Sequence, residues 1–431
     1  MQSKNSLLIR DGRLLDPAQK LDGNFDLLLR DGKVAEVAPR GSIAATGHDV
    51  LDASGMIVAP GFIDIHVHLR EPGQSNKETI ATGTMAAAAG GFTSVCPMPN
   101  TAPINDTAAI TRWMQDPERQ AHVGVFPIAA ATIGSRGERL TDFSALKRAG
   151  AVAVSDDGRP ILGHDIMRDA LSAAAKVGLP VVQHAEDTNL TKEASMNSGP
   201  HAFRLGLRGW PNEAETSIVE RDIELVNTTG GRLHVAHLSA AGALQAVRHA
   251  KSLGLPVTCE VTPHHFALTD EDVGEYRTNY KMNPPLRSEE DRTALLEGLA
   301  DGTVDCIATD HAPHTQNEKN AEFDRAPFGI TGLETALGLC LAILHSKHKV
   351  PIVRIIELLT TNPARIMGLE GRGTLARGSY ADVTVFHPTK KWTYRADETF
   401  SKSRNSPFDG WKMEGKVTAT VVAGKIAYRK K

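Results

Sequence analysis

The stretch Gly61-Phe-Ile-Asp-Ile-His-Val-His-Leu-Arg70 alternates apolar and polar residues. In a β-strand this alternation places the polar side chains on one face and the aliphatic side chains on the other. The polar face carries Asp64, His66, His68 and Arg70. A strand face that meets solvent usually carries Lys, Thr or Ser, whereas two imidazoles two positions apart can share one metal ion. The stretch therefore predicts a strand with metal ligands along one face.

Further apolar runs follow this stretch and alternate with Ala- and Leu-rich helical segments up to about residue 368. The eight predicted strands cover residues 62–68, 92–96, 123–129, 151–155, 180–184, 232–237, 256–261 and 304–309. Alternating strands and helices are typical of repeated βα units. Eight such units over roughly three hundred residues fit an α/β fold of the (β/α)8 TIM-barrel type.

Both ends of the chain show a different pattern, of short strands separated by tight turns. N-terminal strands are predicted at residues 6–10, 25–30, 33–37 and 48–52, with turns at Asp11-Gly12 and Asp31-Gly32. C-terminal strands are predicted at residues 381–387 and 417–429, with a turn at Ala423-Gly424. We therefore expect residues 1–58 and 369–431 to form a small β-sandwich accessory domain, and residues 59–368 to form the barrel.

The composition excludes several classes of protein. A net charge of -3 and a pI near 6.6 give no general attraction to nucleic acid or anionic membranes. The four cysteines are scattered without a CxxC pair, which indicates reduced thiols in a reducing compartment. The first ten residues lack the apolar region of a signal peptide, and no apolar run approaches the length of a membrane span. We therefore expect a cytoplasmic protein that binds neither nucleic acid nor membrane.

Further residues of the metal-ligand type stand at the carboxyl ends of other predicted strands, where barrel enzymes place their chemistry. They are Asp157, His184, His237 and Asp310. With His66 and His68 they make six side chains on one rim. The alternative is that the aspartates cap helices and the histidines are buried and hydrogen-bonded, and it would have to hold for all six at once. Spacing alone does not distinguish Asp157 from its neighbour Asp156.

These motifs resemble the amidohydrolase superfamily and, within it, the class I bacterial dihydroorotases. The resemblance extends over essentially the whole chain. Its most specific stretches are residues 64–73, 97–101, 155–158, 260–265, 283–287 and 308–314. Position by position, it implies that one zinc ion binds His66, His68 and Asp310, that a second binds His184 and His237, and that Asp157 bridges the two.

One departure from the wider superfamily is informative, because many members bridge the two metals with a carbamate on a lysine of the fourth strand. No lysine lies between residues 149 and 176. The resemblance to the class I subtype therefore implies that Asp157 supplies the bridging carboxylate directly. The metal itself stays open, because imidazole and carboxylate ligands accept Zn²⁺, Co²⁺ or Mn²⁺.

The resemblance implies the reversible cyclisation of N-carbamoyl-L-aspartate to L-dihydroorotate in pyrimidine biosynthesis. Two zinc ions would activate hydroxide near neutral pH, and Asp310 would act as general base and acid. Arg70, Asn100 and His314 resemble the residues that bind the substrate carboxylate. Asn283 and the backbone near Phe328 and Gly329 would contact the ring. The polar segment at residues 311–328 is expected to be a mobile loop, and the expected assembly is a homodimer or a complex with aspartate carbamoyltransferase.

Two rival functions are weighed against this one. Another cyclic amidase, such as an allantoinase or a hydantoinase, would use the same metal site but would leave Arg70, Asn100 and His314 without a purpose. An inactive scaffold protein would be expected to have lost metal ligands, and all six are present. Arg70 could also form a surface ion pair with Glu71 or Glu78, and His314 and Asn283 could simply cap loops.

Overall fold

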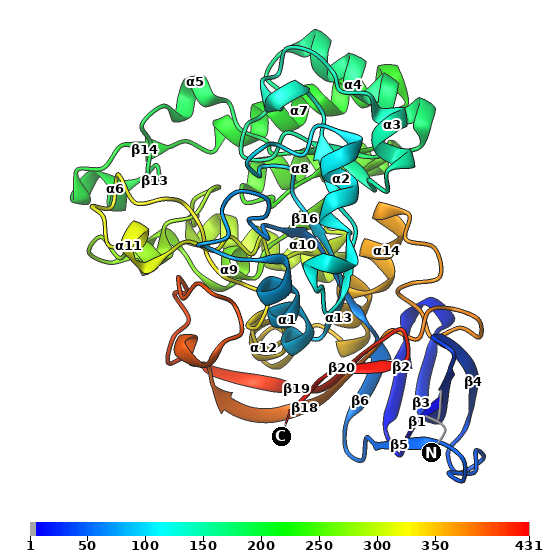
Figure 1. Ribbon diagram of the computed structural model, residues 1–431. Coiled ribbons are helices and arrows are strands. Elements are labelled where there is room, and N and C mark those ends of the chain that lie inside the picture. The colour runs from blue at the N-terminus through cyan, green and yellow to red at the C-terminus, as the bar shows by residue number, and fades with distance from the viewer. Residues whose placement is uncertain (1–5, 431) are drawn as a thin grey trace.

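The computed structural model describes residues 6–430. Figure 1 shows a core of strands surrounded by helices and, beside it, a β layer to which the N-terminal and C-terminal segments both contribute. This arrangement confirms the α/β fold class expected from the sequence, with a β-rich domain built from both ends of the chain.

The core strands all pair in parallel, in the orders β7-β8-β9 and β10-β11-β12-β15-β16-β17. Their bounds are β7 (Phe62–Val67), β8 (Phe92–Pro97), β9 (Gly124–Val125), β10 (Ile128–Ala130), β11 (Ala153–Ser155), β12 (Val181–Gln183), β15 (Leu233–Val235), β16 (Val257–Val261) and β17 (Cys306–Ile307). The run predicted at residues 123–129 is divided into β9 and β10 because Pro127, which has no backbone N–H, lies between them. A parallel bridge between Val67 and His311 joins the first strand to the segment that follows the last one.

The helices surround these strands or lie on loops that project from them (Figure 1). They are α1 (Ile80–Gly90), α2 (Ala108–Met114), α3 (Phe143–Arg148), α4 (His164–Val177), α5 (Thr188–Thr191), α6 (Pro200–Leu205), α7 (Glu213–Thr229), α8 (Ala241–Ser252), α9 (Pro263–Ala267), α10 (Glu289–Asp301), α11 (Gln316–Lys319), α12 (Ala336–Leu339), α13 (Ile352–Leu359) and α14 (Thr361–Met367). Helix α4 buries Met167, Ala170, Leu171 and Ala174, which share one face. Its C-cap is Gly178, whose positive φ of 66° suits a residue without a Cβ. Among residues 6–430, no helix combines the length and the apolar character needed to cross a bilayer.

The β layer is a nine-stranded sheet with the order β20-β19-β18-β6-β2-β3-β1-β5, with β4 paired to β3. Its strands are β1 (Ser6–Arg10), β2 (Arg13–Asp16), β3 (Leu21–Arg30), β4 (Lys33–Pro39), β5 (Asp49–Asp52), β6 (Ile57–Pro60), β18 (Val383–Thr393), β19 (Lys412–Val422) and β20 (Lys425–Arg429). A separate apolar cluster, which includes Leu14, Leu27 and Val383, forms its core. The predicted turns at Asp31-Gly32 and Ala423-Gly424 both adopt positive φ angles. The sheet joins strands from the two ends where β6 pairs with β18.

Strands β18 and β19 are linked by residues 394–411, which we call the connecting segment. Inside it, Ser401 and Asn405 are buried and bond to loops of the barrel. The β layer thus reaches back to the loops that follow the core strands.

Candidate active site

The six predicted metal ligands all lie in or just after core strands. His66 is in β7 and His68 follows it, while Asp157, His184, His237 and Asp310 come within three residues after β11, β12, β15 and β17. All six are buried. Because the strands are parallel, their carboxyl ends meet at one rim, and the structure brings the six side chains together there.

Asp157 lies at the centre of this cluster. Its Oδ1 atom is 3.5 Å from His66 Nε2, 3.6 Å from His184 Nδ1 and 3.7 Å from His237 Nε2. Its Oδ2 atom is 3.7 Å from His68 Nε2. Asp157 therefore stands in two overlapping ligand groups, one with His66 and His68 and the other with His184 and His237.

The neighbouring Asp156 points elsewhere. Its Oδ1 atom accepts a 2.9 Å hydrogen bond from the backbone N–H of Thr132, and its Oδ2 atom accepts one from the Thr132 hydroxyl. Both carboxylate oxygens of Asp156 are thus used in the loop after β10. Of the two aspartates that spacing left open, only Asp157 faces the cluster.

Three of the histidines are oriented by oxygen acceptors behind them. His66 Nδ1 donates to Glu260 over 2.5 Å, and His68 Nδ1 donates to Asn100 over 2.9 Å. In the same way, His184 Nε2 donates to Glu186 over 2.9 Å. Each bond leaves the other ring nitrogen as a lone-pair donor toward the cluster, which is the arrangement that metal-binding histidines require.

Sequence reasoning missed Glu260 and Glu186. Glu260 is a charge inside the apolar run of β16, and Glu186 stands two positions after His184. A carboxylate that shares a strand face with a ligand histidine, or that interrupts a buried strand, would have been the signal to follow.

The cluster fits metal ions on two observations. First, His66 Nε2 and Asp157 Oδ1, which face each other in the cluster, are buried without a hydrogen-bond partner among residues 6–430, which is rare for groups that water cannot reach. Second, burial would lower the pKa of His66, but Asp310, Glu260 and Asp157 raise it well above its ordinary value. The site therefore favours positive charge, and its imidazole and carboxylate donors suit a divalent cation such as zinc.

Asp310, in the segment that follows the last core strand, contacts the same histidines. Its Oδ1 atom lies 2.9 Å from His68 Nε2 and 3.4 Å from His66 Nε2. Burial alone would raise the pKa of Asp310, but His66 and His68 lower it overall. The carboxyl group is thus ionised at neutral pH.

Arg70 and His314 form a buried polar pair beside the ligands. Arg70 Nη2 lies 3.2 Å from His314 Nε2, and Arg70 Nε donates to the Pro313 carbonyl over 3.1 Å. Burial lowers the pKa of Arg70 to about 10, a value at which it is still cationic at neutral pH. Burial and the charges of Arg70 and Lys77 lower the pKa of His314 to about 2, so its imidazole is neutral. Arg70 therefore lies at the site, and within residues 6–430 it forms no surface ion pair.

These groups share one cavity of about 320 Å³. Its lining includes His68, Arg70, Asn100, Asp157, His184, His237, Asn283, Asp310, His314 and Phe328. Asn283 Nδ2 donates to Glu186 over 3.2 Å, while its buried Oδ1 atom has no partner in the described chain. The Phe328 ring packs edge-on against Trp210. The cavity is large enough for a small-molecule ligand.

Gly329 lies behind this wall and does not line the cavity. Its N–H donates to the Lys281 carbonyl over 3.0 Å. A Cβ atom at this position would lie 2.5 Å from the Ala312 carbonyl oxygen and 2.7 Å from His314 Cδ2. Only glycine allows the two loops to approach so closely.

The segment expected to be a mobile loop, residues 311–328, contains the short helix α11 and a buried anchor. Lys319 is 1% exposed. Its ammonium group donates to three backbone carbonyls, those of Pro327 at 2.9 Å, Gly329 at 3.2 Å and Lys281 at 3.4 Å. Nothing in the sequence indicated that Lys319 is buried, because its hydrogen-bond acceptors are backbone carbonyls and not acidic side chains.

Comparison with known proteins gives a consistent result. A family model described as dihydro-orotase-like matches residues 55–242. The dihydroorotase of Solibacter usitatus (strain Ellin6076) is 51% identical over 423 residues, with 98% of each chain covered. The dihydroorotase of Anaeromyxobacter sp. (strain K) is 52% identical over 427 residues, again with 98% of each chain covered.

Solved structures of cyclic amidases share the fold. The L-hydantoinase (dihydropyrimidinase) of Arthrobacter aurescens matches with a TM-score of 0.87 at 25% identity, covering 98% of this chain and 96% of that one. The dihydropyrimidinase of Brevibacillus agri NCHU1002 matches with a TM-score of 0.84 at 24% identity, covering 98% and 95%. At this lower identity the likeness shows the amidohydrolase fold alone. Because sequence identity reaches 51–52% over nearly the full length of the two curated relatives, this chain belongs to the dihydroorotase family.

Proposed function

We propose that this chain is a dihydroorotase that interconverts L-dihydroorotate plus water and N-carbamoyl-L-aspartate. The observation that supports this most directly is the shared cavity, in which a buried cation, Arg70, stands beside the six-residue His/Asp cluster. A cyclic amide that carries a carboxylate matches both features. Neutral rings such as hydantoin or allantoin would leave the buried Arg70 charge uncompensated.

The proposed metal ligands follow the two groups around Asp157. His66, His68 and Asp310 would hold one zinc ion, His184 and His237 the second, and Asp157 would bridge them. Two zinc ions held there would polarise the amide carbonyl and lower the pKa of a water molecule. Glu260, Asn100 and Glu186 fix the histidine rings in the orientation that this binding needs.

The substrate carboxylate is assigned to Arg70, with Asn100 and His314 beside it. Pro313 and His314 hold the Nε and Nη2 atoms of Arg70, which fixes the plane of the guanidinium at the cavity wall. The ring is assigned to Phe328 and Asn283, and the free Oδ1 atom of Asn283 can accept from a ring N–H. Gly329 supports this contact from behind by keeping its loop against His314.

Asp310 is assigned the proton transfer. In ring opening it takes a proton from the attacking water and returns it to the ring nitrogen as the amide C–N bond breaks. In ring closure the same carboxyl group moves the proton in the opposite sense. Its place among the histidines keeps it ionised and ready to act as the base.

A direct assay tests the proposal. Purified zinc-loaded protein is supplied with L-dihydroorotate, hydantoin and allantoin in parallel, and ring opening is followed for each. We expect turnover of L-dihydroorotate far above that of the two uncharged rings. Preferred turnover of hydantoin or allantoin would support the cyclic-amidase alternative, and no turnover of any ring would support the inactive scaffold.

A further inference from the structure

The connecting segment of the β layer holds the loop that carries His314. Asn405 in this segment is 2% exposed. Its Oδ1 atom accepts a 3.0 Å hydrogen bond from the backbone N–H of His314. Its Nδ2 atom donates to the carbonyls of Ala312, at 2.9 Å, and Gly329, at 3.0 Å. One amide side chain thus joins the two loops that approach each other at Gly329.

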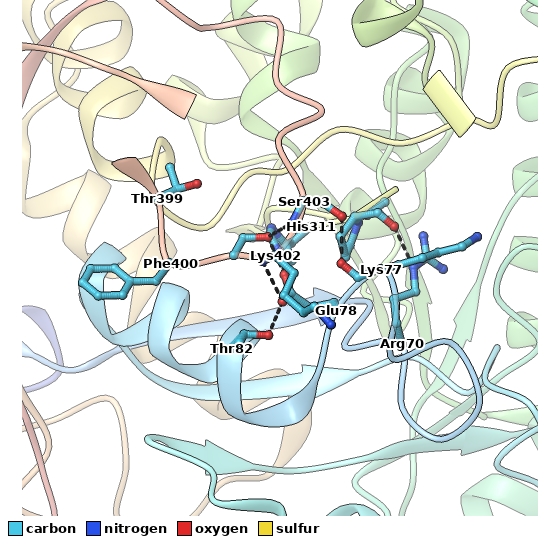
Figure 2. Close-up of polar contacts among 12 residues, drawn as sticks. Arg70, Lys77, Glu78, Thr82, His311, Thr399, Phe400, Lys402 and Ser403 are labelled. Atoms are coloured by element: carbon cyan, nitrogen blue, oxygen red, sulfur yellow. Dashed lines mark hydrogen bonds and ion pairs between the residues drawn. The ribbon is translucent and has the colours of Figure 1, made fainter. Parts of the chain in front are cut away.

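The same segment is anchored a few residues earlier, as Figure 2 shows. Buried Glu78 accepts hydrogen bonds from the Ser401 hydroxyl and from the backbone N–H of Lys402, and it lies 3.3 Å from His311 Nε2. Ser403 Oγ donates to the Lys77 carbonyl over 2.7 Å. The segment is therefore fixed to the loop after β7 before it reaches the His314 loop.

These contacts leave Asn405 little freedom. Both polar atoms of its side chain are used, and its own carbonyl accepts a 3.0 Å bond from the Thr331 N–H. The His314 loop is also held by a 2.9 Å bond from the Ala312 N–H to the Ile330 carbonyl and by the bond from Arg70 to the Pro313 carbonyl. Within the described chain, however, the hydrogen bond to Asn405 is the one that the backbone of His314 itself makes. The position of His314, and through it that of Arg70, depends on Asn405.

We infer that Asn405 is a positioning residue, which sets the place of His314 and thereby the geometry with which Arg70 binds the substrate carboxylate. The inference rests on the proposed function, in which Arg70 and His314 bind the substrate carboxylate. Asn405 lies 91 residues from His314 in the chain and does not line the cavity. It acts on substrate binding and leaves the metal ligands in place.

The test compares Asn405→Ala and Asn405→Asp with wild type and with Ser406→Ala. Ser406 is the matched control because it is a buried neighbour whose hydroxyl bonds within the segment, to the Phe408 N–H. For each zinc-loaded protein, kcat and KM for L-dihydroorotate, bound zinc and the melting temperature are measured. Both Asn405 variants should lose about 10- to 100-fold in kcat/KM, mostly through KM, because small misplacements of binding groups have effects of this size. Bound zinc should be unchanged, and Ser406→Ala should behave as wild type.

Asn405→Asp keeps the size of the side chain and the acceptor for the His314 N–H but loses both donated bonds. If Asn405→Ala does not fold, the KM of Asn405→Asp therefore tests the inference. An unchanged KM in the Asn405 variants would overturn the inference. A fall in kcat that follows lost zinc at constant KM would also overturn it, because the residue would then be merely structural. Failure of wild type and of Ser406→Ala to open L-dihydroorotate would instead reject the proposed function, and the inference with it.

Discussion

His66, Asp157 and His184 lie in a core strand or within two residues of one, whereas Arg70, His314 and Phe328 lie in loops. The first group is placed by the register of the parallel sheet, which is fixed by backbone pairing. The second group is placed by hydrogen bonds from a few buried side chains, such as Asn405 and Lys319. The metal side of the cavity is thus built on the rigid part of the fold, and the substrate side depends on its loops.

This difference predicts different responses to mutation. A change on the metal side removes a shared ligand, so that metal binding and chemistry fail together. A change on the substrate side leaves the metals bound and weakens substrate binding only in part. The variants below separate the two responses, in order of decreasing effect.

Asp157→Ala should abolish both metal binding and activity, because Asp157 belongs to both ligand groups. Bicarbonate should not restore activity, since no lysine between residues 149 and 176 can form a carbamate bridge. Metal analysis and turnover with and without bicarbonate check this. Asp156→Asn is the control. The Asp156 side chain bonds to Thr132 and not to the cluster, so this variant should keep its metals. An active Asp157→Ala enzyme, or a modified lysine in an electron-density map, would contradict the assignment.

Asp310→Asn should slow ring opening and ring closure alike, since one carboxyl group is proposed to move the proton in both directions. The loss should exceed the roughly 10²- to 10⁴-fold that follows removal of a general acid-base group, because a metal ligand is weakened as well. Initial rates in both directions provide the measurement. Impairment in one direction only would be incompatible with this role.

Arg70→Met should weaken binding of L-dihydroorotate by about 2 to 4 kcal/mol, the range for removing one partner of a buried charged pair. Zinc content should stay at the wild-type level, because Arg70 is bonded to Pro313 and His314 and not to the metal ligands. Binding titrations and metal analysis give both quantities. An unchanged affinity for L-dihydroorotate would show that Arg70 does not bind the substrate carboxylate, and it would support the hydantoinase alternative.

Lys319→Met should have the smallest effect, a rise in KM of about 5- to 10-fold, consistent with about 1 kcal/mol lost from neutral acceptors in the loop. The variant removes the anchor of Pro327 and Gly329 but no group that contacts substrate. Steady-state kinetics check it against Lys176→Met, which changes an exposed lysine of α4. A Lys319→Met enzyme with lost zinc would show that the two sides of the cavity are not independent.

The sequence predicted the core better than the β layer. All eight predicted core strands are present, because short apolar runs that recur between helical segments indicate buried parallel strands. Strands β2 and β6 were missed. Strand β2 begins directly after the turn at Asp11-Gly12, and β6 precedes the first core strand with a single residue between them. The domain boundary drawn after residue 58 stays a prediction, and β6 runs across it as part of the β layer.

At the site, too, some residues could be predicted from the sequence and others could not. The ligand residues could be found because their strands carry them in regular positions. The charge of Glu260 inside an apolar run marks that residue but not its partner, and Asn405 carries no such mark. They act on residues that are 194 and 91 positions away in the chain, His66 and His314. Such contacts follow from the assembled fold and leave no local pattern.

The most direct test of the whole account is the dependence of activity on metal. The purified chain is analysed for zinc, stripped with a chelator, and then reconstituted in CO2-depleted buffer while ring opening of L-dihydroorotate is followed. We predict about two ions per chain, loss of activity on stripping and full recovery with zinc alone. Full turnover by metal-free protein would contradict the role assigned to the His/Asp cluster.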